Sequence, residues 1–252
     1  MNNKIKISGL VITYNEEKNI ADVIENLNFV DEIIIVDSFS IDKTIEIISN
    51  YKNVTLIQNK FIDFTSQRNI ALQNARNEWV LFLDADERIS SKLKNEIIAE
   101  IENTNSKDAY LFKRKFYYNR KPIHFSGTQT DKNFRLFKKG NAHYVSDKLV
   151  HETLEVSGTI GVLKHKLAHY SFDNFKTYKA KMKSYGVLKG KELYLKGKKY
   201  NLLTHFSKTF FKFFKTYILR FGILDGVNGI IVCYLQSYSV HYTYKSLRNN
   251  EL

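Results

Sequence analysis

The sequence is short of cysteine, of proline and of long apolar runs. Its single cysteine, Cys233, excludes a disulfide framework and a cysteine-based zinc finger, and it is typical of a reducing compartment. Its single proline, Pro122, excludes a proline-rich linker. No apolar run approaches the roughly 20 residues of a membrane-spanning helix, and the apolar stretch 5–12 lacks the small-residue cleavage site of a secretory signal. We therefore expect a cytoplasmic protein.

Acidic residues are scarce in the last third of the chain. The 252 residues carry a formal net charge of +13. Residues 1–163 hold 22 basic and 22 acidic residues, whereas residues 164–252 hold 17 basic and 4 acidic residues. The whole positive excess therefore lies in the C-terminal third, which indicates an anionic partner for that region, either nucleic acid or a lipid surface.

The first hundred residues alternate between two hydrophobic periods. Buried-strand patterns and helical patterns follow one another at 4–13, 16–27, 32–37, 42–50, 54–58, 66–75, 79–83 and 91–102. Such alternation predicts an α/β fold, a mostly parallel sheet flanked by helices. Further strands are expected at 109–118 and 133–137, with a polar loop between them. From Phe172 onward the chain reads as helical and basic, so we place a boundary near residue 170.

Acidic residues follow the apolar strands at the edge where parallel sheets bind ligands. Asp84 and Asp86 come directly after the run 79–83, and side chains two apart on a strand point to the same face. Two carboxylates held together favour Mg²⁺ or Mn²⁺, with a diphosphate as co-ligand. The alternative is a pair of solvated acids or a helix N-cap. Asp37 ends the strand 32–37, where its carboxylate could accept a hydrogen bond from a ribose hydroxyl or a base imide.

Several segments together resemble the nucleotide-binding half of family 2 glycosyltransferases, which have the GT-A fold. The similarity is greatest to the bacterial branch that adds glucose to the heptose of the lipopolysaccharide core. The matching segments are ITYNEEKNI, DEIIIVDSFSIDKT, FTSQRNIAL and WVLFLDADERIS, followed by NFRLF, VHETLEVSG, LAHYSF and RFGILDGVNG. The resemblance implies a GT-A catalytic domain at 1–170, binding the nucleotide sugar with about 1–105 and the acceptor with about 106–170. Residues 171–252 would form a helical, basic extension.

The resemblance also implies roles for individual residues. Tyr14, Glu16 and Asp37 would surround the uridine of a UDP-sugar, and Arg68 would support the nucleotide. The Asp-x-Asp pair, Asp84 and Asp86, would contact the ribose and the metal, with His169 as a third metal ligand. Glu152 would be the catalytic base, with Asp131 as the alternative. One departure is Phe39, which replaces the glycine of the family's usual Asp-Ser-Gly-Ser.

An inverting displacement needs a base on the acceptor hydroxyl and stabilisation of the departing nucleoside diphosphate. Arg135 or Lys138 could add positive charge there, although we expect both to be solvated or structural.

The segment 205–221 predicts an amphipathic helix with one aromatic face. The aromatic arc comprises Phe206, Phe210, Phe213, Phe214, Tyr217 and Phe221, and Lys208, Lys212 and Lys215 project from the other side. Such a helix suits an anionic membrane surface, or else packs its aromatic side chains on the catalytic domain. The segment 222–240 carries Asp225, Asn228 and Gln236, so we expect it to dock or lie flat rather than to span a membrane.

We predict a glycosyltransferase that acts on a lipid-linked saccharide, the lipopolysaccharide core or a related glycan, at the inner face of the cytoplasmic membrane. A polyprenyl phosphate, another polysaccharide or a protein are alternative acceptors. A nucleic-acid-binding protein is the alternative from another class, but the acidic strand ends would repel phosphates and no known nucleic-acid-binding pattern is present.

Overall fold

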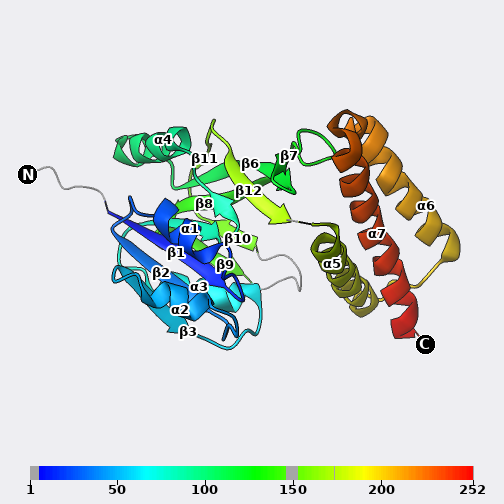
Figure 1. The fold of residues 1–252 in the computed structure, drawn as a ribbon, viewed down its shortest axis with the longest axis horizontal. Coiled ribbons are helices and arrows are strands. Elements are labelled where there is room, and N and C mark those ends of the chain that lie inside the picture. Colours follow the sequence, from blue (N-terminus) through cyan, green and yellow to red (C-terminus); the bar gives the residue numbers. More distant parts are fainter. Residues whose placement is uncertain (1–5, 146–152, 173, 252) are drawn as a thin grey trace, which may run out of the picture. The chain divides into compact units, whose positions relative to one another are not determined.

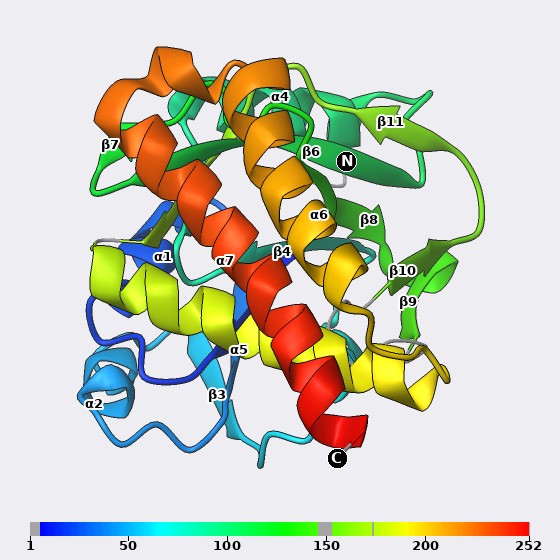
Figure 2. The same ribbon diagram turned by 90° about the vertical axis from the view of Figure 1, so that its right-hand side faces the viewer.

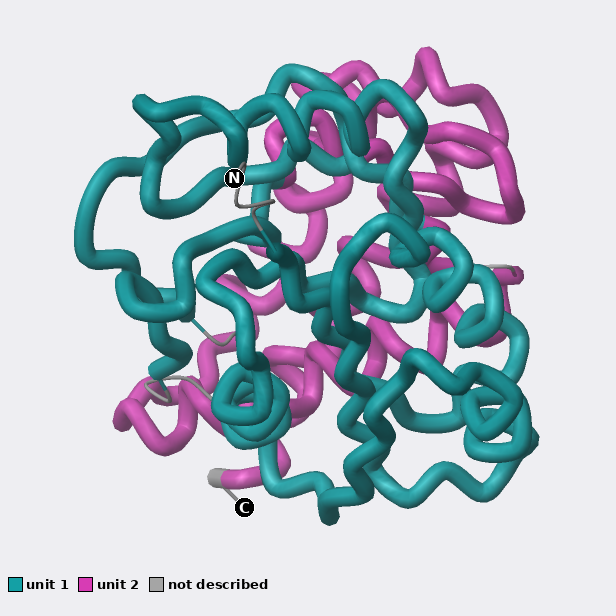
Figure 3. Tube along the Cα trace, turned by 90° about the vertical axis from the view of Figure 1, so that its left-hand side faces the viewer, with its two compact units in different colours: residues 1–114, 132–169 teal, residues 115–131, 170–252 magenta. Residues whose placement is uncertain are grey.

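The computed structural model describes residues 6–145, 153–172 and 174–251, and the chain divides into two compact units (Figures 1 and 3). The first unit comprises residues 1–114 and 132–169, and the second comprises 115–131 and 170–252. The second unit thus resumes at the residue where the sequence suggested a boundary. It also takes residues 115–131, which the sequence analysis assigned to the acceptor side of the first domain.

The first unit begins with four strands alternating with helices. In chain order these are β1 (Ile7–Thr13), α1 (Ile20–Asn26), β2 (Glu32–Asp37), α2 (Thr44–Ser49), β3 (Val54–Gln58), α3 (Phe64–Asn74), β4 (Trp79–Asp84), β5 (Glu87–Arg88) and α4 (Ser91–Glu102). The strands pair in parallel in the order β3-β2-β1-β4. The predicted parallel sheet is therefore present. The first helix begins at Ile20 rather than Glu16, because the Glu16 carbonyl accepts the amides of Asn19 and Ile20 in a preceding turn, both at 2.9 Å.

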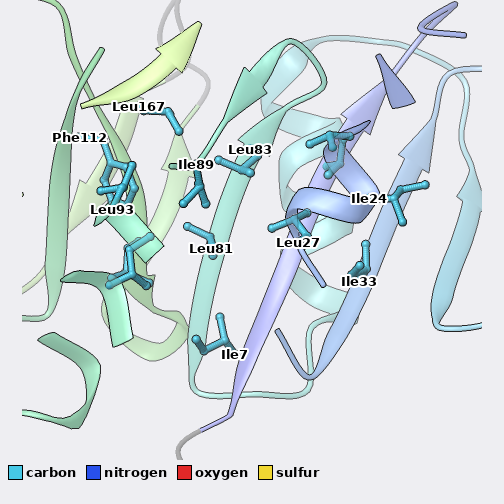
Figure 4. Close-up of a cluster of buried hydrophobic side chains, with 14 of the residues drawn as sticks. Ile7, Ile24, Leu27, Ile33, Leu81, Leu83, Ile89, Leu93, Phe112 and Leu167 are labelled. Carbon is cyan, nitrogen blue, oxygen red and sulfur yellow. The ribbon is translucent and has the colours of Figure 1, made fainter. Parts of the chain in front are cut away.

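Both faces of this sheet are covered, which explains why its strands read as continuous apolar runs. In β4, Leu81 and Leu83 join a buried cluster with Ile24 of α1 and Leu93 of α4 (Figure 4). The alternate residue Phe82 belongs to a second cluster on the opposite face, packed with α3. Two apolar layers thus fix the register of β4 and direct its C-terminal end toward the sheet edge.

The rest of the first unit extends the sheet, mainly by antiparallel pairing, and adds a separate two-stranded sheet. These elements are β6 (Ala109–Tyr118), β8 (Lys132–Lys138), η1 (Lys139–Asn141), β9 (Ala142–Val145), β10 (Thr153–Val156), β11 (Ile160–Val162) and β12 (Leu167–Phe172). β8 pairs with β4 and with β6, both antiparallel. β6 and β12 each cross the division between the units.

The second unit is mostly helical. It contains β7 (Lys121–Pro122), α5 (Phe175–Leu195), α6 (Leu202–Phe214), the π-helical turn η2 (Lys215–Leu219), η3 (Gly222–Asp225) and α7 (Gly226–Glu251). α7 packs against α5 on one side and α6 on the other (Figure 2). The amphipathic helix predicted over 205–221 is present with different bounds: α6 ends at Phe214 and continues as the π-helical turn η2 to Leu219. Phe221 then adopts a left-handed backbone with φ of 56° that turns the chain back.

Candidate functional site

The C-terminal ends of β1, β2 and β4 lie next to one another at one edge of the first unit's sheet. β1 is the central strand, with Thr13 in register with Asp37 of β2 and Ile12 in register with Asp84 of β4. Two of the sequence-predicted residues therefore stand at the edge where parallel sheets bind ligands.

Asp37 shapes the turn that follows β2. It is fully buried, and its carboxylate accepts the backbone amide of Ser40 at 2.8 Å and the Ser40 hydroxyl at 2.5 Å. The Ser40 hydroxyl oxygen in turn accepts the amide of Asn15 at 2.8 Å. Phe39, the residue in place of the family's glycine, has a left-handed φ of 61°. The turn thus keeps a conformation that favours glycine; Asp37 holds it by two hydrogen bonds to Ser40, and a third joins Ser40 to Asn15.

Tyr14 and Glu16 follow β1. The Tyr14 ring is about half exposed, at 56%. The backbone amide of Glu16 donates to the Thr44 hydroxyl at 2.8 Å, and its carboxylate accepts the Asn19 side-chain amide at 2.7 Å. The loop after β1 is therefore tied to the start of α2, and Tyr14 presents an open aromatic face beside it.

Helix α3 directs two buried polar side chains toward the same sheet edge. Its N-terminus is capped by Asp63, which accepts the Ser66 amide at 2.7 Å. One turn later, the buried Gln67 donates to the Ser38 hydroxyl at 2.7 Å. The buried Arg68 lies over the Phe82 ring and donates to Asp84 Oδ1 at 2.8 Å. The sequence analysis predicted Arg68 but missed Gln67, whose polar side chain in a buried helix position was its only signal.

Asp84 is held between two arginines. Its second carboxylate oxygen accepts a hydrogen bond from Arg135 of β8. Although burial alone would raise the pKa of Asp84, the guanidinium groups of Arg135 and Arg68 hold it far below its ordinary value. Asp84 therefore stays ionised at neutral pH, and each of its two oxygens accepts an arginine.

Glu87 connects this cluster and was missed by the sequence analysis. It is completely buried; Oε1 accepts Arg135 at 2.8 Å and Arg114 at 3.4 Å, and Oε2 accepts the Asp84 amide at 3.1 Å. Of the two roles expected for Arg135, solvated or structural, the solvated one is excluded, because its side chain is 5% exposed. An arginine inside the apolar segment NFRLF was the available signal. Lys138, in contrast, pairs with Asp108 at 3.4 Å and stands over the Trp79 ring.

Asp86 lies beside His169 of β12. Antiparallel pairing of β12 with β5 places His169 in register with Glu87. His169 Nε2 lies 3.3 Å from Asp86 Oδ2, and both side chains are largely buried. The two come from distant parts of the sequence, so only the sheet brings them together.

Within the described ranges, no three histidine, cysteine, aspartate or glutamate side chains are arranged to hold a metal ion. A carboxylate and an imidazole nonetheless form a donor pair that fits Mn²⁺ or Mg²⁺ with further oxygen ligands from a substrate.

The two candidate bases are placed differently. Glu152 lies outside the described residues. Asp131 belongs to the second unit, directly before β8, so the first unit does not contain it. The site that the structure assembles in the first unit is therefore the strand-end cluster of Asp37, Asp84, Asp86 and their partners.

Comparison with known proteins matches residues of this chain to one family. A model described as Glycosyl transferase family 2 matches residues 8–159. An uncharacterized glycosyltransferase of Rickettsia conorii is 28% identical over 260 residues, which cover 98% of this chain and 91% of that protein. The lipopolysaccharide core biosynthesis glycosyltransferase LpsC of Rhizobium meliloti is 26% identical over 165 residues, which cover 63% of this chain and 60% of LpsC.

Solved structures show the same fold at low identity. The mannosyltransferase PcManGT from Pyrobaculum calidifontis, in complex with GDP-Man and Mn²⁺, aligns at a TM-score of 0.57 with 11% identity over 98% of this chain and 88% of its own. S. aureus TarS 1–349, in complex with UDP-GlcNAc, aligns at a TM-score of 0.50 with 16% identity over 97% of this chain and 93% of its own. These likenesses concern the fold.

Proposed function

We propose that this chain, which belongs to glycosyl transferase family 2, transfers a sugar from a UDP-sugar to a lipopolysaccharide-core or related cell-surface glycan. The chain is an enzyme of the GT-A fold, as its sequence predicted, and its donor is a nucleotide sugar. UDP as the nucleotide is supported by the UDP-GlcNAc complex of TarS, and the glycan acceptor by the similarity to LpsC. The observation that carries the proposal is the strand-end cluster, in which Asp84 is fixed between two arginines while Asp86 faces His169.

Asp86 and His169 are the residues that we assign to a divalent cation. Both oxygens of Asp84 already accept arginine donors, so Asp84 suits the ribose and the orientation of the site better than direct ligation. When bound, Mn²⁺ or Mg²⁺ supplies positive charge to the diphosphate. In this chain, Asp86 and His169 fix where that charge stands.

The nucleotide would lie against Tyr14, Glu16 and Asp37. The exposed Tyr14 ring offers a stacking surface for a base. The Asp37 carboxylate, which already holds the Ser40 turn, orients the backbone that would face the base and ribose. Arg68 of α3 donates to Asp84 and thereby fixes α3 relative to the end of β4, where we place the nucleotide.

The transfer step requires a carboxylate that takes the proton of the acceptor hydroxyl as the new glycosidic bond forms. Such a base typically contributes about 10²–10⁴-fold to the rate. Glu152 is our first candidate and Asp131 the second. The acceptor that we propose is lipid-linked, which would place the enzyme at the inner face of the cytoplasmic membrane.

The test uses the purified full chain with a panel of UDP- and GDP-sugars, with and without Mn²⁺, scored by nucleotide release and by thermal shift. We expect a UDP-sugar to be turned over and Asp86→Asn to lower metal-dependent turnover at least about 100-fold. Asp22→Asn is the matched control, because Asp22 is an exposed acid of the same unit that pairs with Arg88. Turnover by Asp86→Asn at the rate of the Asp22 control would refute the metal assignment.

The same assay identifies the base. Glu152→Gln and Asp131→Asn are compared for donor binding and for transfer to lipopolysaccharide-core saccharides. The base is the residue whose substitution preserves the donor-induced thermal shift and abolishes transfer. If no nucleotide sugar is bound or hydrolysed, the proposed function fails altogether.

A further inference from the structure

Helix α6 packs against the rest of the second unit through its polar side. His205 is buried, and its Nε2 lies 3.0 Å from Nδ1 of His241 in α7. One turn further, the carbonyl of Thr209 accepts the hydroxyl of Ser237 at 2.8 Å. Thr216, on the same face, is also buried. The helix is therefore inverted relative to a helix of a water-soluble core, whose apolar side faces inward.

The aromatic side of α6 faces outward as a result. Phe206 is 61% exposed and Phe210 is 70% exposed, and Phe210 stacks on the partly exposed Phe214 one turn later. Burying such rings in the protein would stabilise the fold. Leaving several of them exposed along successive turns is unusual for a surface that contacts only water.

Exposed apolar residues continue through the reversal of the chain between α6 and α7, a reversal that Figure 2 shows. Leu224 is 64% exposed and Val227 is 74% exposed, and Phe221 at the turn is also exposed. We call these exposed apolar side chains of residues 202–230 the apolar bend. In the described part of the chain, no single helix is long and apolar enough to cross a membrane, whereas 202–219 and 222–250, bent by 72°, meet the criteria of length and composition only as a pair.

The charge around the apolar bend is positive. Residues 202–219 contain Lys208, Lys212 and Lys215 and no acidic residue. The nearest acid in sequence, Asp225, accepts the backbone amides of His124 and Phe125, both at 2.9 Å. The lysines of α6 therefore have no acidic residue on their own helix, and the acid that follows it serves the backbone.

We propose that the apolar bend lies in the interface of an anionic lipid bilayer, with the rings of α6 among the acyl chains and its lysines at the lipid phosphates. A second copy of this chain is a poorer occupant, because its matching segment 202–219 carries the same lysines and no acidic residue to complement them. Anionic lipid headgroups supply the complementary charge for lysines near the surface. The role of the contact, presenting a lipid-linked acceptor, rests on the proposed function; the contact itself does not.

The experiment measures flotation of the full chain with vesicles of phosphatidylethanolamine and phosphatidylglycerol, compared with pure phosphatidylcholine. The test variant is Phe210→Ser/Leu224→Ser, which changes two exposed side chains. The control is Ile160→Ser, an exposed apolar residue of β11 in the first unit. We expect wild type and control to bind anionic vesicles, and the double variant to bind about 10- to 100-fold more weakly. Circular dichroism of each variant confirms folding, and donor turnover, measured separately without vesicles, reports on the catalytic proposal.

Three outcomes would overturn the inference. One is equal vesicle binding by wild type and double variant. Another is a wild-type dimer in analytical ultracentrifugation that the double variant converts to a monomer without any vesicle binding, since the occupant would then be a second copy. The third is binding that survives extraction by alkaline carbonate, because a spanning pair of helices resists it and an interfacial one does not.

Discussion

Replacing Arg135 by methionine tests the charge cluster behind Asp84. Arg135 is buried and contacts two carboxylates, so its loss leaves both without that partner. Asp84 keeps Arg68 at 2.8 Å and its side chain is 28% exposed, which softens the effect there. Glu87 has no exposure and keeps only Arg114, at 3.4 Å, as a cation. Removing one partner of a buried ion pair costs about 3–5 kcal/mol, and we expect about 3 kcal/mol because Asp84 is partly compensated.

Urea denaturation followed by fluorescence gives the direct measurement. Trp79 is the only tryptophan, is buried in β4 and so reports on the strand that carries Asp84. With a slope of about 2 kcal/mol per molar urea, the midpoint should fall by about 1.5 M. Lys138→Met is the matched control, because Lys138 lies on β8 like Arg135. Its ion pair with Asp108 is partly exposed and should stabilise the fold by less than about 1 kcal/mol.

The pH dependence of this difference follows from the lowered pKa of Asp84. A carboxyl whose pKa is lower in the folded state stabilises the fold above its unfolded pKa of about 3.9, and loses that contribution as the pH falls toward the folded value. The difference in the free energy of unfolding between wild type and Arg135→Met should therefore be constant from pH 6 to 8 and become smaller only below about pH 4. A loss under about 1 kcal/mol at pH 7, or one equal to that of Lys138→Met, would refute the reasoning.

Two further predictions concern the second unit. A Cβ at Gly190 would stand 2.4 Å from the Thr243 carbonyl oxygen, so Gly190→Ala should destabilise the contact of α5 with α7 by about 1–3 kcal/mol, whereas Gly140→Ala, with open space around it, should leave the melting temperature unchanged. Burial lowers the pKa of both His205 and His241, and nearby positive charge lowers each further, from His241 and Arg248 at His205 and from Lys245 at His241. The folded protein therefore resists protonation of these histidines, and its stability should fall as the pH drops below about 6.5. A melting temperature that is the same at pH 7.5 and 5.5 would contradict this.

The sequence by itself determined the alternating strands and helices of residues 7–102 and the acids at the strand ends. Apolar runs such as 79–83, alternating with helical patterns, favour central strands of a covered sheet, and a parallel arrangement places Asp37 and Asp84 at one edge. Local hydrogen bonding explains the small errors at helix ends, as at Glu16.

Only the tertiary structure decided which side chains meet. Arg135 reaches Asp84 and Glu87 because β8 pairs with β4, and His169 reaches Asp86 because β12 pairs with β5; neither pairing is encoded in local periodicity. The orientation of α6 is a second case. Its pattern defines an aromatic face and a polar face but not which of them turns inward, and contacts of His205 and Thr209 with α7 settle this, because buried polar groups must find hydrogen-bond partners.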